Sequence, residues 1–125
     1  MPFTYFRDDE AQRVVITLEG AFDPAEVLEI LKRHRAENVP TYGIIYDGRG
    51  LVGEPTVDEA RGILNERVRN EMGRGPVAFV VTAPNFYRLA CTYVNLAGAT
   101  RVNMEVFRDI FEAEAWLASK IKSSS

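Results

Sequence analysis

A glycine-rich segment, Gly48-Arg-Gly-Leu-Val-Gly53, carries the clearest sign of chemistry in this sequence of 125 residues. Its spacing satisfies G-x-G-x-x-G, the pattern of loops that hold the pyrophosphate of a dinucleotide between a strand and a helix. In such loops the glycines form the turn and open the helix, so that free N–H groups meet the phosphates. The first question is therefore whether this segment binds a dinucleotide.

The residues around the segment argue against dinucleotide binding. Glu54 and Pro55 follow the third glycine, and Thr56 is placed as the N-cap of the next helix, so every glycine precedes that helix. The acidic side chain that would hold the ribose is expected at the end of the next strand, where this sequence has Thr82. Glu54 would also bring a negative charge close to the phosphates. We interpret the segment as a surface turn.

Other catalytic or metal-binding groups are sparse. The only histidine, His34, and the only cysteine, Cys91, fall on different predicted helices, and all serines lie at positions 119 and 123–125. Most carboxylates fall at helix starts, where helix geometry already explains them. We expect no catalytic residues, no cofactor and no metal site. Cys91 is interpreted as a buried structural thiol, and His34 either ends an apolar stripe or assists a helix C-terminus.

The composition is that of a single soluble domain, which we place at residues 1–119 with a flexible tail at 120–125. Hydrophobic residues make up 46% and charged residues 26% of the chain, and the formal net charge is −3. This charge gives no basic field for nucleic acid or anionic lipid. Basic residues at 32–35 and at Arg67, Arg69 and Arg74 fall near predicted helix ends, where cations are favourable. No signal peptide or membrane span is visible, so we expect a cytoplasmic protein.

Hydrophobic periodicity and capping residues predict alternating strands and helices after an initial hairpin. The expected elements are strands at 3–7 and 13–20, a helix at 24–37, a strand at 41–47, a helix from Thr56 to a stop at Gly73, a strand at 77–82, a helix at 85–98, a strand at 102–107 and a helix from Asp109. The order β-β-α-β-α-β-α-β-α predicts an α/β fold with a mixed five-stranded sheet and an N-terminal antiparallel hairpin. The strand at 77–82 is the most apolar and is expected to be central.

Ligands of such sheets bind beyond the carboxyl ends of the strands. At these ends, and at the helix starts that follow them, the sequence offers groups that suit an anion. The candidate ligand-binding residues are Asp47, Arg49, Thr56, Asn85 and Arg88.

The helix at 85–98 is apolar over most of its circumference. Beside its main apolar stripe runs a second one, formed by Tyr87, Cys91 and Val94. Either the helix has an unusually wide core face, or the second stripe is a subunit or ligand surface, for which tyrosine and arginine are well suited. We keep these three residues as candidate interface residues.

Several segments resemble the SpoIIAA-like (STAS/SEC14-type) bacterial proteins. The resemblance lies in the Asp47 loop, the strand Val77–Val81, the segment Phe86–Ala90 and above all the ending Val106-Phe-Arg-Asp109 followed by Glu114-Ala-Trp-Leu117. It implies a mixed five-stranded sheet flanked by helices and a regulatory role without catalysis. Regulatory members carry a phosphorylatable Ser or Thr just after an aspartate. Here Asp47 is followed by Gly48-Arg-Gly50, so the resemblance does not extend to that switch.

Together these observations predict a non-enzymatic binding or regulatory module that acts through protein–protein contacts, as a homodimer. The alternative is a protein that binds a small molecule, either an anion, a nucleotide or a lipid-like compound, at the carboxyl edge of the strands. An enzyme with an unfamiliar site is the least supported class.

Overall fold

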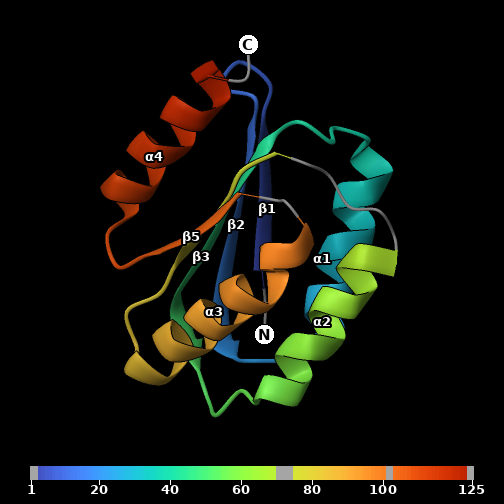
Figure 1. Ribbon diagram of the computed structural model, residues 1–125, viewed down its shortest axis with the longest axis vertical. Coiled ribbons are helices and arrows are strands. Elements are labelled where there is room, and N and C mark those ends of the chain that lie inside the picture. Colours follow the sequence, from blue (N-terminus) through green and yellow to red (C-terminus); the bar gives the residue numbers. More distant parts are fainter. Residues whose placement is uncertain (1–2, 70–74, 101–102, 124–125) are drawn as a thin grey trace.

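The computed structural model describes residues 3–69, 75–100 and 103–123 and shows a five-stranded mixed sheet with four α-helices (Figure 1). The elements are β1 (Phe3–Asp8), β2 (Arg13–Ala21), α1 (Pro24–Glu37), β3 (Gly43–Val52), α2 (Val57–Arg69), β4 (Val77–Val80), α3 (Pro84–Leu96), a 3-10 turn (Ala97–Thr100), β5 (Met104–Phe107) and α4 (Ile110–Ser123). The predicted element order and the mixed sheet are confirmed. The predicted helix stop at Gly73 and the strand residue Val102 lie outside the described residues.

The strands lie side by side in the order of the chain, β1-β2-β3-β4-β5. β1 and β2 form the predicted antiparallel hairpin, and β2 to β5 are parallel. One register row crosses the whole sheet, and it consists of Tyr5, Ile16, Tyr46, Phe79 and Val106. Because the strand order never reverses between β2 and β5, the parallel part of the sheet has no switch-point crevice of the kind in which doubly wound folds bind ligands.

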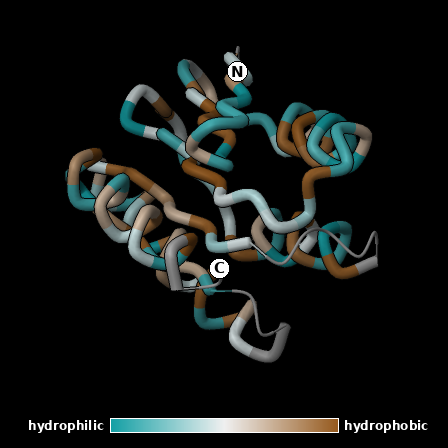
Figure 2. Tube along the Cα trace, turned by 90° about the horizontal axis from the view of Figure 1, so that it is seen from above, coloured by the Kyte–Doolittle hydropathy of each residue, from teal (hydrophilic) through white to brown (hydrophobic). Residues whose placement is uncertain are grey.

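The strand order also decides which face each helix covers. Right-handed crossovers that always advance in the same direction place α1, α2 and α3 on the same face of the sheet. α4 follows the last strand and packs on the opposite face, where Ala113 and Leu117 contact Ile45, Ala78 and Val80 (Figure 1). The larger core cluster lies under α1, α2 and α3. Along each helix hydrophobic and hydrophilic residues alternate, as expected for helices with one buried side (Figure 2).

The predicted helix starts are present as hydrogen bonds. Asp23 accepts from the N–H of Ala25 at 3.0 Å, and Thr56 and Glu59 form a reciprocal capping box, with distances of 3.1 and 2.9 Å. Asp109 accepts from the N–H groups of Phe111 and Glu112 at 2.7 and 3.2 Å. These caps fix where α1, α2 and α4 begin, and hence where the strand-to-helix loops end.

The glycine-rich segment differs from the prediction. We expected β3 to end at Asp47, but it continues to Val52, and Gly48 and Gly50 are strand residues. Pairing with β2 explains the extension, because after a register shift Glu19 lies opposite Gly50 and Ala21 opposite Val52. Tertiary pairing here overrides the poor intrinsic strand preference of glycine.

Two further expectations need correction. The last helix continues to Ser123, so the tail expected at 120–125 is helical over its first four residues, and 124–125 lie outside the described residues. The strand at 77–80 is buried on both faces, as expected, but the central strand is β3. β4 lies next to the edge strand β5 and is nevertheless buried, because α4 covers the outer face of β3, β4 and β5.

Candidate functional site

An apolar cavity of about 110 Å³ lies between the sheet and the three helices α1, α2 and α3. The sheet and every one of these helices contribute to its wall, and none of the lining residues carries a charge. The lining residues are Leu18, Phe22, Val27, Leu31, Tyr46, Gly48, Leu51, Ala60, Ile63, Phe79, Val81, Phe86, Leu89, Ala90 and Tyr93. Because most of them belong to the carboxyl half of a strand or the amino half of a helix, the cavity lies toward the carboxyl edge of the sheet.

Small residues keep this space open. Ala60 and Ala90 face the cavity where larger apolar side chains would fill it. Gly48, the first glycine of the sequence motif, also lines the cavity, and a Cβ there would lie 2.9 Å from Leu51 Cδ1 and 3.1 Å from Val81 Cγ1. The glycine at position 48 therefore lets Leu51 and Val81 approach the strand closely, a role that the motif alone did not indicate.

Asp47 and Arg49, two of the candidate ligand residues, bind each other. The Asp47 carboxylate accepts from Arg49 Nε at 2.9 Å, from Nη2 at 2.8 Å and from the Arg49 backbone N–H at 3.2 Å. The hydrogen bonds from Arg49 lower the pKa of Asp47 below its usual value. A guanidinium held by a carboxylate in this way has little remaining attraction for a second anion.

The other candidate ligand residues do not converge on one point. Thr56 is occupied in its capping box. Asn85 donates from Nδ2 to the carbonyl of Gly53 at 2.7 Å, and so links the start of α3 to the segment after β3. Arg88 is exposed on α3. The five residues predicted to bind an anion therefore lie near the carboxyl edge, and the side chains of four of them have partners within the protein.

The candidate interface residues Tyr87, Cys91 and Val94 are half-buried. The Cys91 thiol is free, and its partial exposure corrects the expectation of a fully buried structural cysteine. The guanidinium of Arg108 lies over the Tyr87 ring, 4.1 Å from its centroid, so part of this side chain is already used within the chain.

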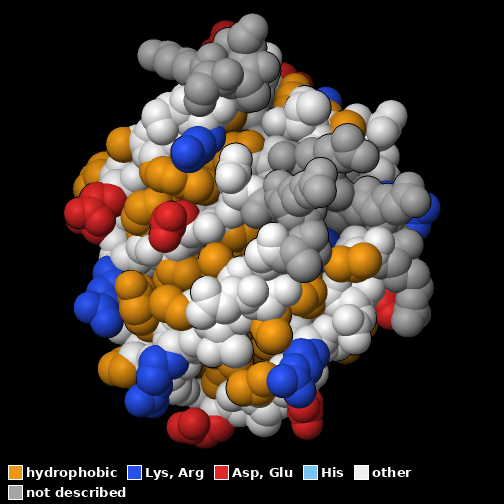
Figure 3. All heavy atoms as spheres, viewed as in Figure 1, with side chains coloured by type: hydrophobic (Ala, Val, Ile, Leu, Met, Phe, Trp, Pro, Cys, Tyr) orange, Lys and Arg blue, Asp and Glu red, His pale blue; other side chains and the backbone are white. Residues whose placement is uncertain are grey.

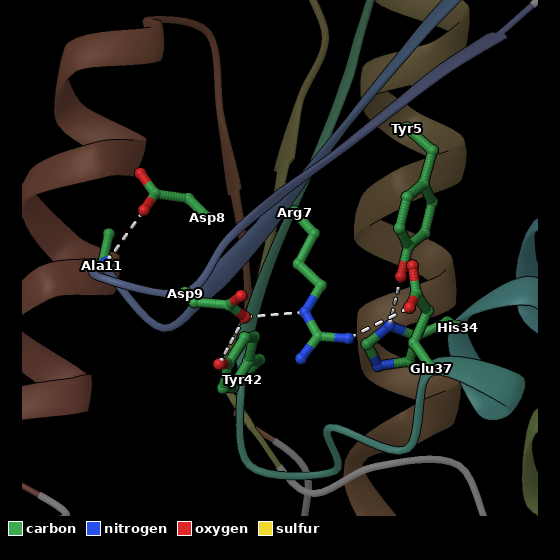
Figure 4. A network of polar contacts seen from close by, with 8 residues as sticks. All are labelled: Tyr5, Arg7, Asp8, Asp9, Ala11, His34, Glu37 and Tyr42. Atoms are coloured by element: carbon green, nitrogen blue, oxygen red, sulfur yellow. Dashed lines mark hydrogen bonds and ion pairs between the residues drawn. The ribbon is translucent and has the colours of Figure 1, made fainter.

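A buried polar cluster was not predicted. It consists of four buried residues, His34, Tyr46, Arg67 and Tyr93, together with the half-buried Tyr5. His34 is 3% and Arg67 6% exposed, and the Tyr5 hydroxyl lies 3.3 Å from His34 Nδ1 (Figure 4). Arg67 was expected near a helix end, where a cation is favourable, and it is buried because it continues the buried side of α2 after Ala60 and Leu64. The same spacing places His34 on the buried side of α1 after Leu31. This agrees with the prediction that His34 ends the apolar stripe of this helix.

Burial and charge act on the titratable groups of this cluster. Burial, together with the Arg67 charge, lowers the pKa of His34 from 6.5 to about 4, so His34 is neutral at physiological pH. Burial raises the pKa of Tyr93 to about 12, and burial together with Glu37 raises the pKa of Tyr5 to about 12. Arg67 is therefore the one cationic member of the cluster.

A second polar network lies beside this cluster and is exposed (Figure 4). Arg7 bonds to Asp9 at 2.7 Å and to Glu37 at 3.0 Å, and the Tyr42 hydroxyl donates to Asp9 at 2.7 Å. These contacts tie the hairpin to the end of α1 and the start of β3. All of its charged groups are paired, so we assign it a structural role.

Comparisons with known proteins found no matching family model, no matching curated protein and no matching solved structure. Within residues 3–69, 75–100 and 103–123, no helix is long and apolar enough to cross a bilayer. In the same ranges, no group of three or more His, Cys, Asp or Glu side chains is placed to hold a metal ion.

Proposed function

We propose that the protein is a non-enzymatic SpoIIAA-like module that binds a small, largely apolar molecule in the cavity under α1, α2 and α3. The observation that carries this proposal is the cavity itself, whose lining has no charged residue. Apolar walls with a few polar groups at one end are typical of small-molecule sites. Of the two function classes that the sequence suggested, small-molecule binding is the better supported, although the site lies beneath the carboxyl edge and not on it.

The energetic cost of the cavity supports the same proposal. Protein interiors are close-packed, and voids larger than a water molecule are few. The cavity of about 110 Å³ is only partly enclosed, so its apolar lining is in contact with water until a ligand covers it, which is unfavourable. One larger side chain at position 60 or 90 would cover part of the same lining. A sequence with alanine at both positions is suited to a cavity that is filled by a ligand.

Benzene and xenon test the proposal, because both enter dry apolar cavities of this size class. We expect both to bind the wild-type protein, seen as shifts in ¹²⁹Xe and protein methyl resonances and, for benzene, as a rise in Tm. Ala90→Leu is expected to remove binding and to raise the free energy of unfolding of the ligand-free protein by about 1 kcal/mol. Ala115→Leu is the matched control, since Ala115 is exposed on α4 and remote from the cavity. Equal binding by all three proteins, or by none, would contradict the proposal.

A second candidate function, the protein–protein contact that the sequence suggested, is favoured by a separate observation. Hydrophobic side chains gather over α3, β5 and α4 on the face shown in Figure 3. On α3 the side chains of Tyr87, Cys91 and Val94 are half-buried, and Phe111 at the start of α4 is 75% exposed. Exposed apolar surface of this kind marks interaction sites in soluble proteins. We propose that this face pairs two copies of the chain.

A charge on this face is expected to separate the two copies. In sedimentation velocity the wild-type protein should have the mass of a dimer, and Val94→Asp that of a monomer, because a buried unpaired carboxylate at an interface is strongly unfavourable. Asn95→Asp is the matched control, because Asn95 is exposed on the same helix. A wild-type monomer, or a dimer that persists in Val94→Asp, would count against this face.

A further inference from the structure

The wall of the cavity is rich in aromatic side chains. Five of its fifteen lining residues are aromatic, whereas aromatic residues make up only 10% of the chain, so rings are concentrated at this site. They are Phe22, Tyr46, Phe79, Phe86 and Tyr93. Aliphatic side chains form the buried core on the other face of the sheet, where Ile45, Val80 and Leu117 pack together. The cavity therefore differs from that core in its rings, and not only in being unfilled.

Three of these rings form a continuous array across the sheet and α3. Tyr46 on β3 is stacked on Phe79 on β4, with the ring centroids 5.3 Å apart and an interplanar angle of 13°. Phe79 in turn meets the ring of Tyr93 on α3 edge to face, with a centroid distance of 5.5 Å and an angle of 75°. Phe79 lines the cavity and is only half-buried. The ring in the middle of the array thus has surface left for a ligand.

A second aromatic pair lies at the carboxyl edge of the sheet. Phe22 comes between the end of β2 and the N-cap of α1, and Phe86 lies in the first turn of α3. Their rings meet edge to face, with centroids 6.0 Å apart and an angle of 62°. Together with the array, this pair brings rings to the cavity from the sheet, from α3 and from the loop before α1. A flat ligand in the cavity would meet rings on more than one side.

The chemistry of the wall selects among apolar ligands. An aromatic ring has a negative face and a positive edge, so two rings in offset-stacked or edge-to-face contact attract each other beyond the effect of burial. A saturated ring has no such charge pattern. The surface of the lining is almost entirely apolar and none of the lining residues is charged. A charged or hydrogen-bonding group placed in the cavity would therefore lose its water without gaining a partner.

We propose that the ligand of the cavity has a single neutral aromatic ring, without a polar substituent on the part that is buried. This inference rests on the proposed function, because the ring is the apolar group that fills the space left open by Gly48, Ala60 and Ala90. The cavity volume of about 110 Å³ suits one ring and not a fused pair, since an apolar cavity of roughly 150 Å³ accommodates benzene.

Three ligands of similar size test the inference, namely toluene, cyclohexane and phenol. Cyclohexane is less soluble in water than toluene, so the hydrophobic effect alone would favour cyclohexane. In NMR titrations of the protein methyl resonances at pH 7, the wild type is expected to bind toluene at least about three-fold more tightly than cyclohexane. Phenol has a hydroxyl in place of the methyl group of toluene. It is expected to bind at least about ten-fold more weakly than toluene.

Substitutions in the wall test the role of its rings. Phe79→Leu and Phe86→Leu each replace a ring by an aliphatic side chain, and in both the ratio of the toluene to the cyclohexane affinity is expected to fall to about one. Phe107→Leu is the matched control and should leave the ratio unchanged. Phe107 packs beside Trp116 under α4, on the opposite face of the sheet, with a centroid distance of 5.7 Å. If one wall variant does not fold, the other variant and the wild-type ligand series decide.

The outcomes separate the inference from the proposed function. Wild-type protein that binds cyclohexane as tightly as toluene would overturn the aromatic ligand and leave the apolar site intact. Phenol bound as tightly as toluene would reveal a polar partner in the cavity and overturn the unsubstituted ring. A preference for toluene that persists in both wall variants would overturn the role of Phe79 and Phe86. Failure to bind any of these compounds, benzene included, would overturn the proposed function as well.

Discussion

Gly75→Ala is expected to lower the free energy of unfolding by about 3 kcal/mol, a large part of the stability of a domain of this size. Gly75 is buried, and its N–H donates to the carbonyl of Pro40 at 3.1 Å. A Cβ at this position would overlap the carbonyl of Tyr42 and lie 2.8 Å from the carbonyl oxygen of Thr41. Both obstacles are backbone atoms, which cannot rotate away as a side chain can. Thermal unfolding should show a Tm about 10 °C lower.

The backbone at 41–42, which would have to move to make room for the Cβ, also anchors other parts of the fold. Tyr42 reaches Asp9 in the hairpin through its hydroxyl, and the N–H of Ile44 donates to the carbonyl of Pro76 at 2.9 Å to begin the pairing of β3 with β4. The control is Gly62→Ala in α2, where a Cβ would meet nothing within 4 Å. That variant should be stabilised by about 0.5–1 kcal/mol, because alanine is the better helix former. Equal stability of the two variants would refute the steric argument.

The second large effect is a loss of stability in acid that is due to His34. The folded-state pKa of about 4 lies below the unfolded value of 6.5. Above pH 6.5 the side chain is neutral in both states and has no effect. As the pH falls below 6.5, His34 binds a proton in the unfolded state but not in the folded state. The free energy of unfolding therefore decreases until the pH reaches about 4. Over the whole window the loss is about 3 kcal/mol, at 1.36 kcal/mol per pKa unit.

Urea unfolding of the wild type and of His34→Gln at pH 7.5 and 5.5 measures this contribution. Because His34 is the only histidine, no other side chain has its ordinary pKa in that interval. The wild type should lose about 1 kcal/mol between the two pH values, and His34→Gln markedly less. The groups that face His34 are Tyr5, Arg67 and Glu37. An NMR titration of the imidazole with a midpoint near 6.5 would refute the prediction.

Local signals in the sequence were sufficient to predict the order of the strands and helices. Caps such as Asp23 and the Thr56–Glu59 box depend on residues within one turn of each other, so their positions follow from the sequence alone. The extension of β3 through Gly48 and Gly50 was missed, because it depends on pairing with β2. The central strand was also predicted wrongly. β4 was expected to be central because it is the most apolar strand, but it is buried because α4 covers its outer face.

The candidate site was harder to predict because its parts are distant in the sequence. The cavity is a property of side chains from the sheet and three helices together, and no local pattern reports an unfilled volume. Arg67 did leave a signal, since it continues the spacing of Ala60 and Leu64 on the buried side of α2. Its place near a helix end was interpreted instead as a favourable position for a cation in the helix dipole. Arg49 was predicted to bind an anion, and the structure adds that Asp47, two residues away, already pairs with its guanidinium.

The strand order of the sheet has a consequence for how the chain folds during synthesis. Each strand pairs with the strand immediately before it in the sequence, so no pairing has to wait for a distant segment. The parallel pairs are non-local, since Arg13 pairs with Gly43 across α1, but no crossover in the sheet passes over a strand. The hairpin, then β3 and then β4 can each add to a growing edge as they leave the ribosome. Only the outer face of the sheet has to wait for α4, which covers it and follows all five strands in the chain.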